Sequence, residues 1–404
     1  MAVFHIDKPK AVEPSFFDYI VHIISLPWQF LKYVGNYYMG GVLGKLILQA
    51  QSTYEPVTNP DDVRNVLAEY PLDSHVETST FYTAHDSVVT QTTAVLIPDK
   101  ALTHKKHTII THDDAELETL ELNPVSLQKT PIEKQTYIIN FLGNADIYQH
   151  YYDEMKCEAK LYNANIIGFN YRGVLNSKKA PQSQDDLITD GIAQVQRLLD
   201  TGVDPKKIIL KGESLGAAIA TMVAGYFHTH KQKINISNGR SFSTLTNEVV
   251  GQIRQTGAHE QKGHTETKKG IFLGYLLMPL IKLILHLGQW DMQPVKAYKQ
   301  IDEENKMYYL VRSPKSLREQ GCIDDHVIPH YASLHKGLEK SERKKESKCK
   351  NRDRNNAHCQ PSHRLVNKDK VTALQMFGLF VKKVQSRNPN SNVPKPDQGI
   401  QKSL

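Results

Sequence analysis

A serine flanked by two glycines lies where an apolar run meets a stretch of small residues, in KIILKGESLGAAIAT at 207–221. The apolar run predicts a strand and the small residues predict a helix. A serine hydroxyl is a weak nucleophile, so it must stand clear of the backbone where a base and a carbonyl can both reach it. A sharp strand-to-helix turn does this, and Gly212 and Gly216 relieve the crowding around Ser214. We therefore expect Ser214 to be the nucleophile of an acyl transfer, with the Leu215 amide as one oxyanion donor.

Two further motifs precede this turn, and together the three resemble the α/β-hydrolase superfamily. FLGNA at 141–145 resembles the H-G-N-A loop that follows the third strand in one branch of that superfamily, with Leu142 where the branch commonly has histidine. By position, the resemblance implies that the Asn144 amide is the second oxyanion donor. FNYRG at 169–173 resembles the D-Y-R-G turn after the fourth strand. The resemblance covers 76–383 and implies a serine, acid and histidine in that chain order.

The acid is expected after the apolar run KMYYLVRS at 306–313. There CIDDHVIP resembles the family's D-x-V-V-P turn, in which the acid lies four residues before the proline. Pro329 therefore indicates Asp325, with the adjacent Asp324 as the alternative. Two neighbouring carboxylates cannot both face one imidazole, so we expect the other to face solvent or to cap a turn.

The base is expected in the last third of the chain. AHCQP at 357–361 resembles the family's G-H-N-x-P loop, which implies His358 as the base, with His363 as a second candidate. The segment before this loop, KKESKCKNRDRNN, lacks the apolar residues expected of a final strand. Two interpretations stay open: the strand is very short, or the site has lost its base and the chain acts by binding.

The order of apolar segments predicts the elements that must position these residues. Short apolar runs at 135–145, 163–173 and 207–212 alternate with helical patterns, and further strands are expected at 233–242 and 306–313. Strands alternating with helices predict an α/β fold with a mostly parallel, doubly wound sheet. A Val- and Thr-rich pair of segments at 76–96 predicts a leading antiparallel hairpin, and 99–134 is a polar, variable stretch to which we assign no element. A last helix is expected at 370–384.

The remaining segments divide the chain around one hydrolase domain at 76–386. Residues 1–70 predict an apolar helical extension, in which 16–50 either packs on the domain or lies on a membrane surface. Insertions at this point commonly form caps in α/β-hydrolases, so the resemblance implies a helical cap insertion at 245–298. Its apolar piece at 271–290 is either an ordinary buried helix or a lid facing acyl chains. Residues 339–357 predict a basic loop, and 387–404 a disordered tail.

Composition limits the partners of this chain of 404 residues. The net charge of +7 is concentrated between 339 and 370, where no aromatic residue offers the stacking platform of a single-strand binder, so we expect no nucleic acid. The spacing of the two cysteines and two histidines between 349 and 363 matches no standard zinc motif, so we expect neither metal nor cofactor. Four cysteines in a chain of this length indicate reduced thiols.

The motifs together predict a serine esterase or lipase-like enzyme that acts on a small-molecule or lipid acyl ester, or on a thioester. Because FNYRGV and KGESLGAAIAT also resemble hydrolase-like effectors of type IV secretion systems, and no Sec signal peptide is recognisable, we expect a cytoplasmic or translocated protein, with a membrane surface as a candidate partner. The alternative is an α/β-hydrolase-fold effector or scaffold without catalysis.

Overall fold

The computed structural model describes residues 2–5, 101–255, 266–313, 324–344, 346–351 and 357–388. The hairpin predicted at 76–96 and the apolar segment at 16–50 lie outside the described residues, as do Cys322 and the tail from residue 389. Four residues of the predicted helical extension are described, and they form a strand, β1 (Ala2–His5), parallel to β2.

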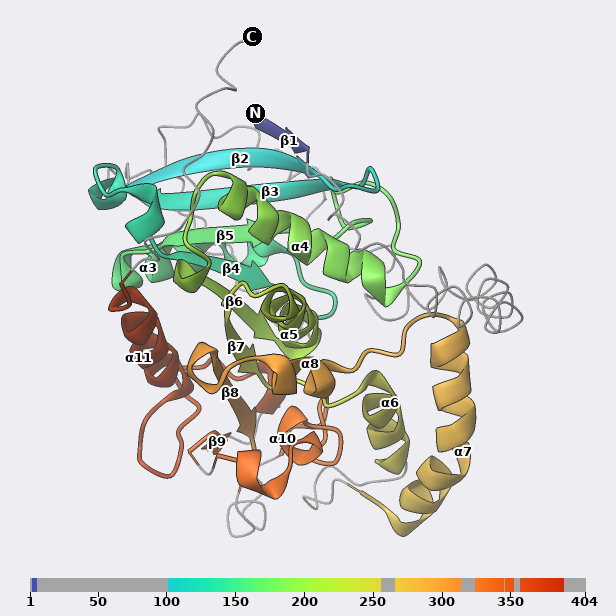
Figure 1. The fold of residues 1–404 in the computed structure, drawn as a ribbon. Coiled ribbons are helices and arrows are strands. Elements are labelled where there is room, and N and C mark those ends of the chain that lie inside the picture. Colours follow the sequence, from blue (N-terminus) through green and yellow to red (C-terminus); the bar gives the residue numbers. More distant parts are fainter. Residues whose placement is uncertain are drawn as a thin grey trace, which may run out of the picture.

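A single sheet organises the described residues (Figure 1). Its strand order is β1-β2-β3-β5-β4-β6-β7-β8-β9. β3 is antiparallel to both of its neighbours, β2 and β5, and every other pairing is parallel. The predicted mostly parallel α/β sheet is therefore confirmed. After β1, the strands are β2 (Leu102–Ile110), β3 (Glu116–Pro124), β4 (Tyr137–Phe141), β5 (Asn165–Phe169), β6 (Ile208–Glu213), β7 (Asn235–Gly239), β8 (Lys306–Val311) and β9 (Lys348–Cys349).

Helices cover both faces of the sheet. On one face lie α4 (Gln184–Asp200), α5 (Ser214–Thr229) and α8 (Pro294–Gln300), and on the other lie α3 (Tyr152–Tyr162) and α11 (Ala373–Gln385) (Figure 1). Two adjacent residues of β6 face the two helical layers, because side chains alternate between the faces of a sheet along a strand. Lys211 bonds Glu158 of α3 at 2.5 Å, whereas a Cβ atom on Gly212 would lie 2.6 Å from the backbone of Ala217 in α5.

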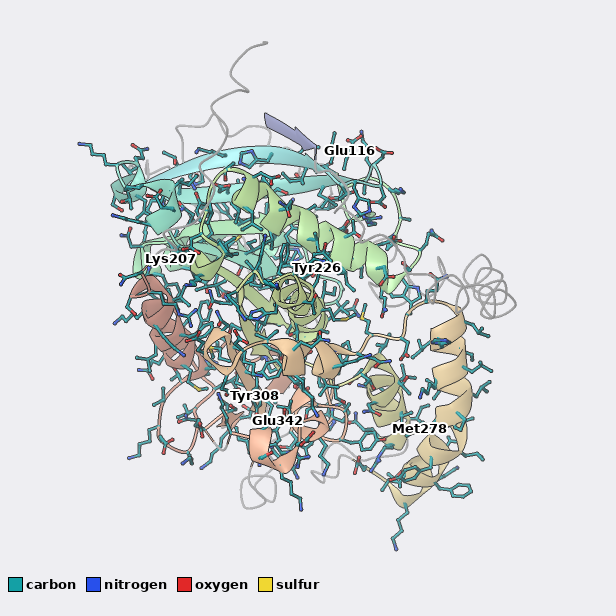
Figure 2. The ribbon with its side chains drawn as sticks, in the orientation of Figure 1. Glu116, Lys207, Tyr226, Met278, Tyr308 and Glu342 are labelled. Carbon is teal, nitrogen blue, oxygen red and sulfur yellow. The ribbon has the colours of Figure 1, made fainter. Side chains whose placement is uncertain are left out.

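The central strands are buried because helices cover both faces of the sheet. Every residue of β4, β5 and β7 is buried, as expected of parallel strands between two helical layers. The amino end of β6 is tied to the last helix, since Lys207 Nζ donates to the carbonyl oxygens of Gln385 at 2.8 Å and Arg387 at 2.6 Å (Figure 2 labels Lys207). The carboxyl edge of the sheet is left for loops.

Two helices, α6 (Leu245–Arg254) and α7 (Lys268–Leu287), stand beside the main body where the cap was predicted (Figure 1). They pack closely on each other, because a Cβ atom on Gly270 would lie 2.3 Å from the carbonyl oxygen of Arg254. The short helix α10 (Leu334–Gly337) follows the loop at 324–333, which carries Asp324 and Asp325 and is called the acid loop below.

The sequence prediction was wrong about 99–134, where the structure has the paired strands β2 and β3. The pattern misled because charged residues occupy buried positions of this hairpin. Glu121 is 5% exposed, and its Oε2 accepts a hydrogen bond from Arg197 of α4 at 2.8 Å. Burial raises the pKa of Glu121, but the neighbouring His107, the charge of Arg197 and the hydrogen bonds from Asn123 and Arg197 outweigh burial and hold the pKa at about 2. The carboxylate is thus a paired charge on an inner strand of the sheet.

Candidate active site

The serine turn connects β6 to α5, and α5 begins at Ser214. Ser214 has a φ of 55°, a left-handed conformation that costs a non-glycine residue about 1–3 kcal/mol. The neighbouring glycines are required by close backbone approach. A Cβ atom on Gly216 would lie 2.1 Å from the carbonyl oxygen of Phe141. The strained turn thus fits between β4 and α5 only because both flanking residues lack side chains.

Side chains from β7 brace the first turns of α5. Asn238 Nδ2 donates to the carbonyl oxygen of Ala217 at 3.1 Å and to Thr221 Oγ1 at 2.8 Å. All three residues are fully buried. These bonds fix the helix whose amino terminus carries the Leu215 amide.

The proposed oxyanion loop lies directly against the serine. A Cβ atom on Gly143 would be 3.9 Å from Ser214 Cβ and 3.8 Å from the carbonyl oxygen of Glu213. Ala145, two residues on, has a φ of 62°, and Asn144 between them is exposed. The loop after β4 therefore runs past Ser214, and the amides of Asn144 and Leu215 belong to the two segments that meet there.

The Arg172 side chain of the FNYRG motif anchors the loop after β5. Arg172 is completely buried, and its Nε donates to Asp190 Oδ1 of α4 at 2.8 Å. Its Nη1 bonds Asp113 Oδ2 at 2.6 Å. Burial raises the pKa of Asp190 to about 6, against the opposing effect of the Arg172 charge. The described contacts of this arginine are structural, and they join β5, α4 and the β2–β3 turn.

The acid loop follows β8 and places its two carboxylates differently. Asp324 Oδ1 accepts from the Ser313 amide at 2.6 Å. Asp325 Oδ1 accepts from the Ile328 amide at 2.8 Å, and Asp325 is 4% exposed. The two neighbours therefore have separate tasks: Asp324 closes the loop onto β8, and Asp325 turns toward the histidine loop.

Helix α6 holds this acid loop from the side. Gln252 Nε2 donates to the carbonyl oxygen of Val327 at 2.5 Å, and Gln255 Nε2 to that of His326 at 2.8 Å. Glu248, also on α6, is partly buried, and burial followed by the nearby charge of Asp325 raises its pKa to about 8, with the Gln252 hydrogen bond opposing. Helix α6 is thus connected to the loop that carries Asp325.

The imidazole bonded to Asp325 is that of His358. His358 Nδ1 lies 2.9 Å from Asp325 Oδ2 and 3.1 Å from Oδ1. Because a carboxylate only accepts, Nδ1 carries the hydrogen and the lone pair of the neutral ring is on Nε2. The alternative candidate, His363, is exposed on the turn that follows.

The final strand of the sheet is present but short. β9 spans 2 residues and pairs in parallel with β8. Its Cys349 is fully buried in a small cluster with Tyr309, Val311, Ala357 and Leu365. Part of the predicted basic loop is therefore built into the domain. Among the described residues, no three His, Cys, Asp or Glu side chains are grouped as a metal site.

One arginine joins the serine turn to the histidine loop. Arg240, just after β7, donates from Nε to Glu213 Oε2 at 3.0 Å. Its Nη1 donates to the carbonyl oxygens of His358 at 2.5 Å and Gln360 at 2.8 Å. Tyr309 Oη donates to the other oxygen of Glu213 at 2.5 Å. Since Glu213 immediately precedes Ser214, this bridge ties the two halves of the candidate site together.

Sequence reasoning missed both Glu213 and Arg240. Glu213 lies inside the pentapeptide, at a position where the motif accepts any residue. Arg240 follows β7, a fully buried strand, at its carboxyl end, where functional residues of parallel sheets gather. Surveying the charged residues at every strand end would have found the arginine, but not its partners.

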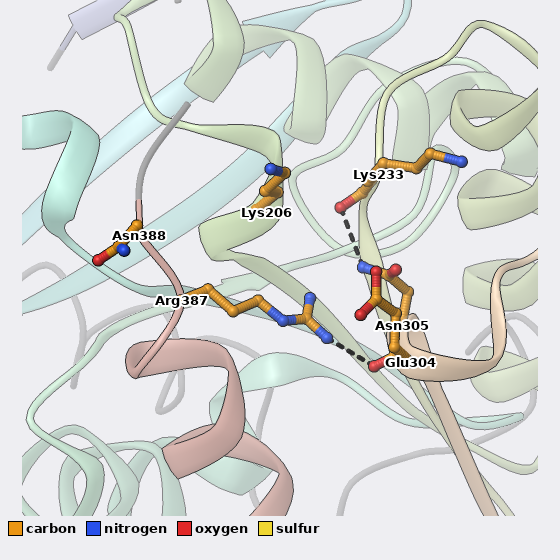
Figure 3. A pocket seen from close by; sticks show the side chains of 6 residues that line it. All are labelled: Lys206, Lys233, Glu304, Asn305, Arg387 and Asn388. Carbon is orange, nitrogen blue, oxygen red and sulfur yellow. Dashed lines mark hydrogen bonds between the residues drawn. The ribbon is translucent and has the colours of Figure 1, made fainter. Parts of the chain in front are cut away.

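A cavity of about 230 Å³ lies elsewhere on the domain, among Lys206, Lys233, Glu304, Asn305, Arg387 and Asn388 (Figure 3). Lys206 precedes β6 and Asn305 precedes β8, so the cavity is at the amino ends of these strands. Ser214 follows the carboxyl end of β6. The cavity is therefore at the opposite edge from the candidate site, and Arg387 partly closes it by donating to the Glu304 carbonyl at 2.6 Å.

Comparison with known proteins gives distant similarities. A family model described as "Chlamydia CHLPS protein (DUF818)" matches residues 79–246. No curated protein matches the chain.

Solved structures with similar coordinates include an alpha-beta hydrolase from Vibrio vulnificus, 17% identical over 54% of this chain and 66% of that one, with a TM-score of 0.39. An acetyl xylan esterase from Paenibacillus sp. R4 is 12% identical over 69% and 83%, with a TM-score of 0.43. The Pf2001 esterase from Pyrococcus furiosus is 18% identical over 52% and 69%, with a TM-score of 0.34.

The fold is argued from the chain's own topology. A mostly parallel sheet is covered on both faces, and its β6–α5 turn carries a serine with positive φ between two sterically required glycines. This strand, strained turn and helix constitute the structural context of the nucleophile elbow. The chain therefore has an α/β-hydrolase fold.

Proposed function

We propose that the protein is a serine hydrolase that cleaves carboxylic esters through Ser214, His358 and Asp325. The observation that carries this proposal is the hydrogen bond between His358 Nδ1 and Asp325, at 2.9 Å. A histidine oriented by a buried carboxylate, in the same domain as a serine on a strained elbow, is the combination that acyl transfer requires.

In the proposed mechanism, His358 Nε2 accepts the proton of Ser214 Oγ as that oxygen attacks the ester carbonyl. The amides of Leu215 and Asn144 donate to the oxyanion of the tetrahedral intermediate. The imidazolium, stabilised by the Asp325 carboxylate, then gives its proton to the departing alcohol and leaves an acyl-enzyme. Water repeats the sequence, and Ser214 regains its proton as the acid is released.

The substrate we propose is an apolar acyl group in a carboxylic ester, a lipid ester or a thioester. Two exposed apolar features support it: Val327 within the acid loop is 39% exposed, and α7, which packs on α6, exposes several large apolar side chains. Delivery through a type IV secretion system stays a prediction from sequence resemblance.

A fluorophosphonate probe tests the proposal, because it phosphonylates a serine only when a base activates the hydroxyl. We expect the full chain to be labelled, Ser214→Ala to be unlabelled and His358→Gln to be labelled at least about 1000-fold more slowly. His363→Gln is the matched control and should be labelled at the original rate.

Absence of labelling in folded protein would reject the hydrolase in favour of a binding scaffold on the same fold. Labelling that is lost in His363→Gln but kept in His358→Gln would retain the nucleophile and reassign the base.

A further inference from the structure

Helix α7 exposes an apolar surface along one side. Of its 20 residues, five large apolar side chains are 45–69% exposed, namely Phe272, Tyr275, Leu276, Leu280 and Leu283. Their spacing of three and four residues puts them on one face of the helix. A single exposed leucine is ordinary, but a contiguous row of this kind indicates a contact surface.

The opposite side of α7 is fixed to the domain. Gly270 and Gly274 pack against Arg254 and Val250 of α6, and Leu285 is buried near the carboxyl end. At the margin of the exposed face, the ring centroid of Tyr275 lies 5.6 Å from the Arg254 guanidinium. Because one side is held along its length, the exposed side forms the outer boundary of the molecule, where side chains of α7 project away from α6 (Figure 2).

The charges on α7 are all of one sign. Lys268 and Lys269 are exposed at its amino end and Lys282 is exposed in its last turns, and no Asp or Glu occurs between 268 and 287. Apolar residues in the centre of a face, with lysines at its ends and margin, are the pattern of a helix that lies in the headgroup region of an anionic bilayer. A protein partner would need a matching acidic surface, and an acyl chain alone would leave the lysines without a role.

Helix α7 is long and apolar enough to span a membrane, and only 17% of its most apolar 18-residue stretch is buried. Its packing on α6 argues against spanning. A helix held along one side by a polar domain can present only its other side to lipid, so it lies parallel to the surface.

We propose that α7 is a membrane-docking helix, whose exposed face inserts into the headgroup layer of anionic phospholipid bilayers. On docking, α6 lies behind α7 on the side away from the membrane, and Gln252 of α6 and Gln255 just after it hold the loop of Asp325. Docking would therefore attach the domain to the membrane through a helix pair that also contacts the acid loop. The docking surface stands on the exposure and charge of α7, independently of the proposed hydrolysis.

Vesicle flotation of the full chain tests this, using the Ser214→Ala background so that hydrolysis plays no part. The vesicles contain phosphatidylcholine alone or with about 30% phosphatidylserine. We expect flotation with the anionic vesicles, weakened when salt rises from about 0.1 to 0.5 M. Phe272→Gln/Leu276→Gln/Leu280→Gln should bind at least about tenfold more weakly.

Two matched controls accompany this variant. Leu161→Gln/Leu379→Gln changes leucines that are 65% and 63% exposed on other helices, and should float like the parent. Lys268→Glu/Lys269→Glu should lose binding to anionic vesicles, whereas Lys105→Glu/Lys340→Glu, with the same change of charge elsewhere, should lose much less.

Three results would overturn the proposal. The first is that the parent protein does not float with anionic vesicles. The second is that the α7 variants float as well as the parent, which would assign the binding to another segment such as 16–50. In the third, sedimentation finds the parent as a dimer that both sets of α7 substitutions convert to monomer without affecting flotation, so that a second copy covers the face.

Discussion

The serine turn and the histidine loop solve the same problem, the placement of one side chain, by different physical means. The turn is fixed by backbone packed on backbone, as in the 2.1 Å approach that a Cβ atom on Gly216 would make to Phe141. The histidine loop is fixed by an arginine that donates to carbonyl oxygens of Ala357, His358 and Gln360. Every residue has a backbone carbonyl that can accept a hydrogen bond, but only glycine lacks the side chain that would block the close approach of two backbone segments.

This difference explains why one half of the site is plain in the sequence and the other is not. Close backbone packing restricts residue types, so the elbow has a motif. Hydrogen bonds to carbonyl oxygens place no restriction on the side chains of the loop, so the loop can be basic and polar without losing its position. The degenerate final strand therefore does not by itself indicate a lost base.

The largest expected effect separates the two adjacent acids. Asp325→Asn removes the charge that stabilises the imidazolium, so we expect kcat for an ester to fall about 10³–10⁴-fold. Asp324→Asn keeps an oxygen for the Ser313 amide and should change kcat less than about tenfold. Steady-state kinetics on one soluble ester measures both, and equal losses in the two variants would mean that neither carboxylate acts on the base.

The second effect tests the rigidity of the serine turn. Gly216→Ala forces a Cβ atom against the Phe141 and Leu142 carbonyl oxygens, so we expect the free energy of unfolding to fall by about 3–5 kcal/mol. Gly378→Ala, in α11, meets only the Tyr162 ring at 3.4 Å and should be neutral or stabilising by up to about 1 kcal/mol. Urea denaturation of both variants checks this, and a stable Gly216→Ala protein would disprove the packing argument.

The third effect tests the arginine bridge. Arg240→Met keeps much of the side-chain volume but loses the bonds to Glu213 and to the histidine loop, so we expect kcat to fall about 10–100-fold with little change in KM. Arg240→Lys should recover only part of the rate, because an ammonium group lacks the planar fork of donors. Added guanidinium ion should raise the rate of Arg240→Ala at a concentration that leaves the parent unchanged. If guanidinium ion does not raise the rate of Arg240→Ala and the variant also loses much of its free energy of unfolding, Arg240 has only a structural role.

The smallest effect concerns the pH dependence of the acid loop's support. The pKa of Glu248 is raised from 4.5 to about 8, so between these values the folded protein keeps a proton that the unfolded chain has lost. Its contribution is fully present below 4.5 and is lost as the pH rises toward 8, by at most about 1.4 kcal/mol per pH unit. Glu248→Gln should reduce this fall in stability.

Urea denaturation of the parent and Glu248→Gln across this pH range measures the effect. Parallel stability curves for the two proteins would show that Glu248 titrates alike when folded and unfolded.

The sequence by itself determined the mostly parallel sheet and the serine turn. Apolar runs such as those of β4 and β5 follow from burial on both faces, and the paired glycines follow from backbone contact. It did not reveal the β2–β3 hairpin, because Glu121 is buried there only with a partner, Arg197, that lies 76 positions away.

Only the tertiary structure decided which histidine meets which acid and what holds that pair. His358 and Asp325 are 33 residues apart, and the arginine that supports the loop is 118 residues from His358. A sequence motif reflects restrictions between residues that are close in the chain. A hydrogen bond between distant loops depends instead on how the sheet positions the strands from which those loops emerge. The elbow could therefore be read from 5 consecutive letters at 212–216, whereas resemblance only suggested Asp325 and His358, and their contact and its arginine support required the fold.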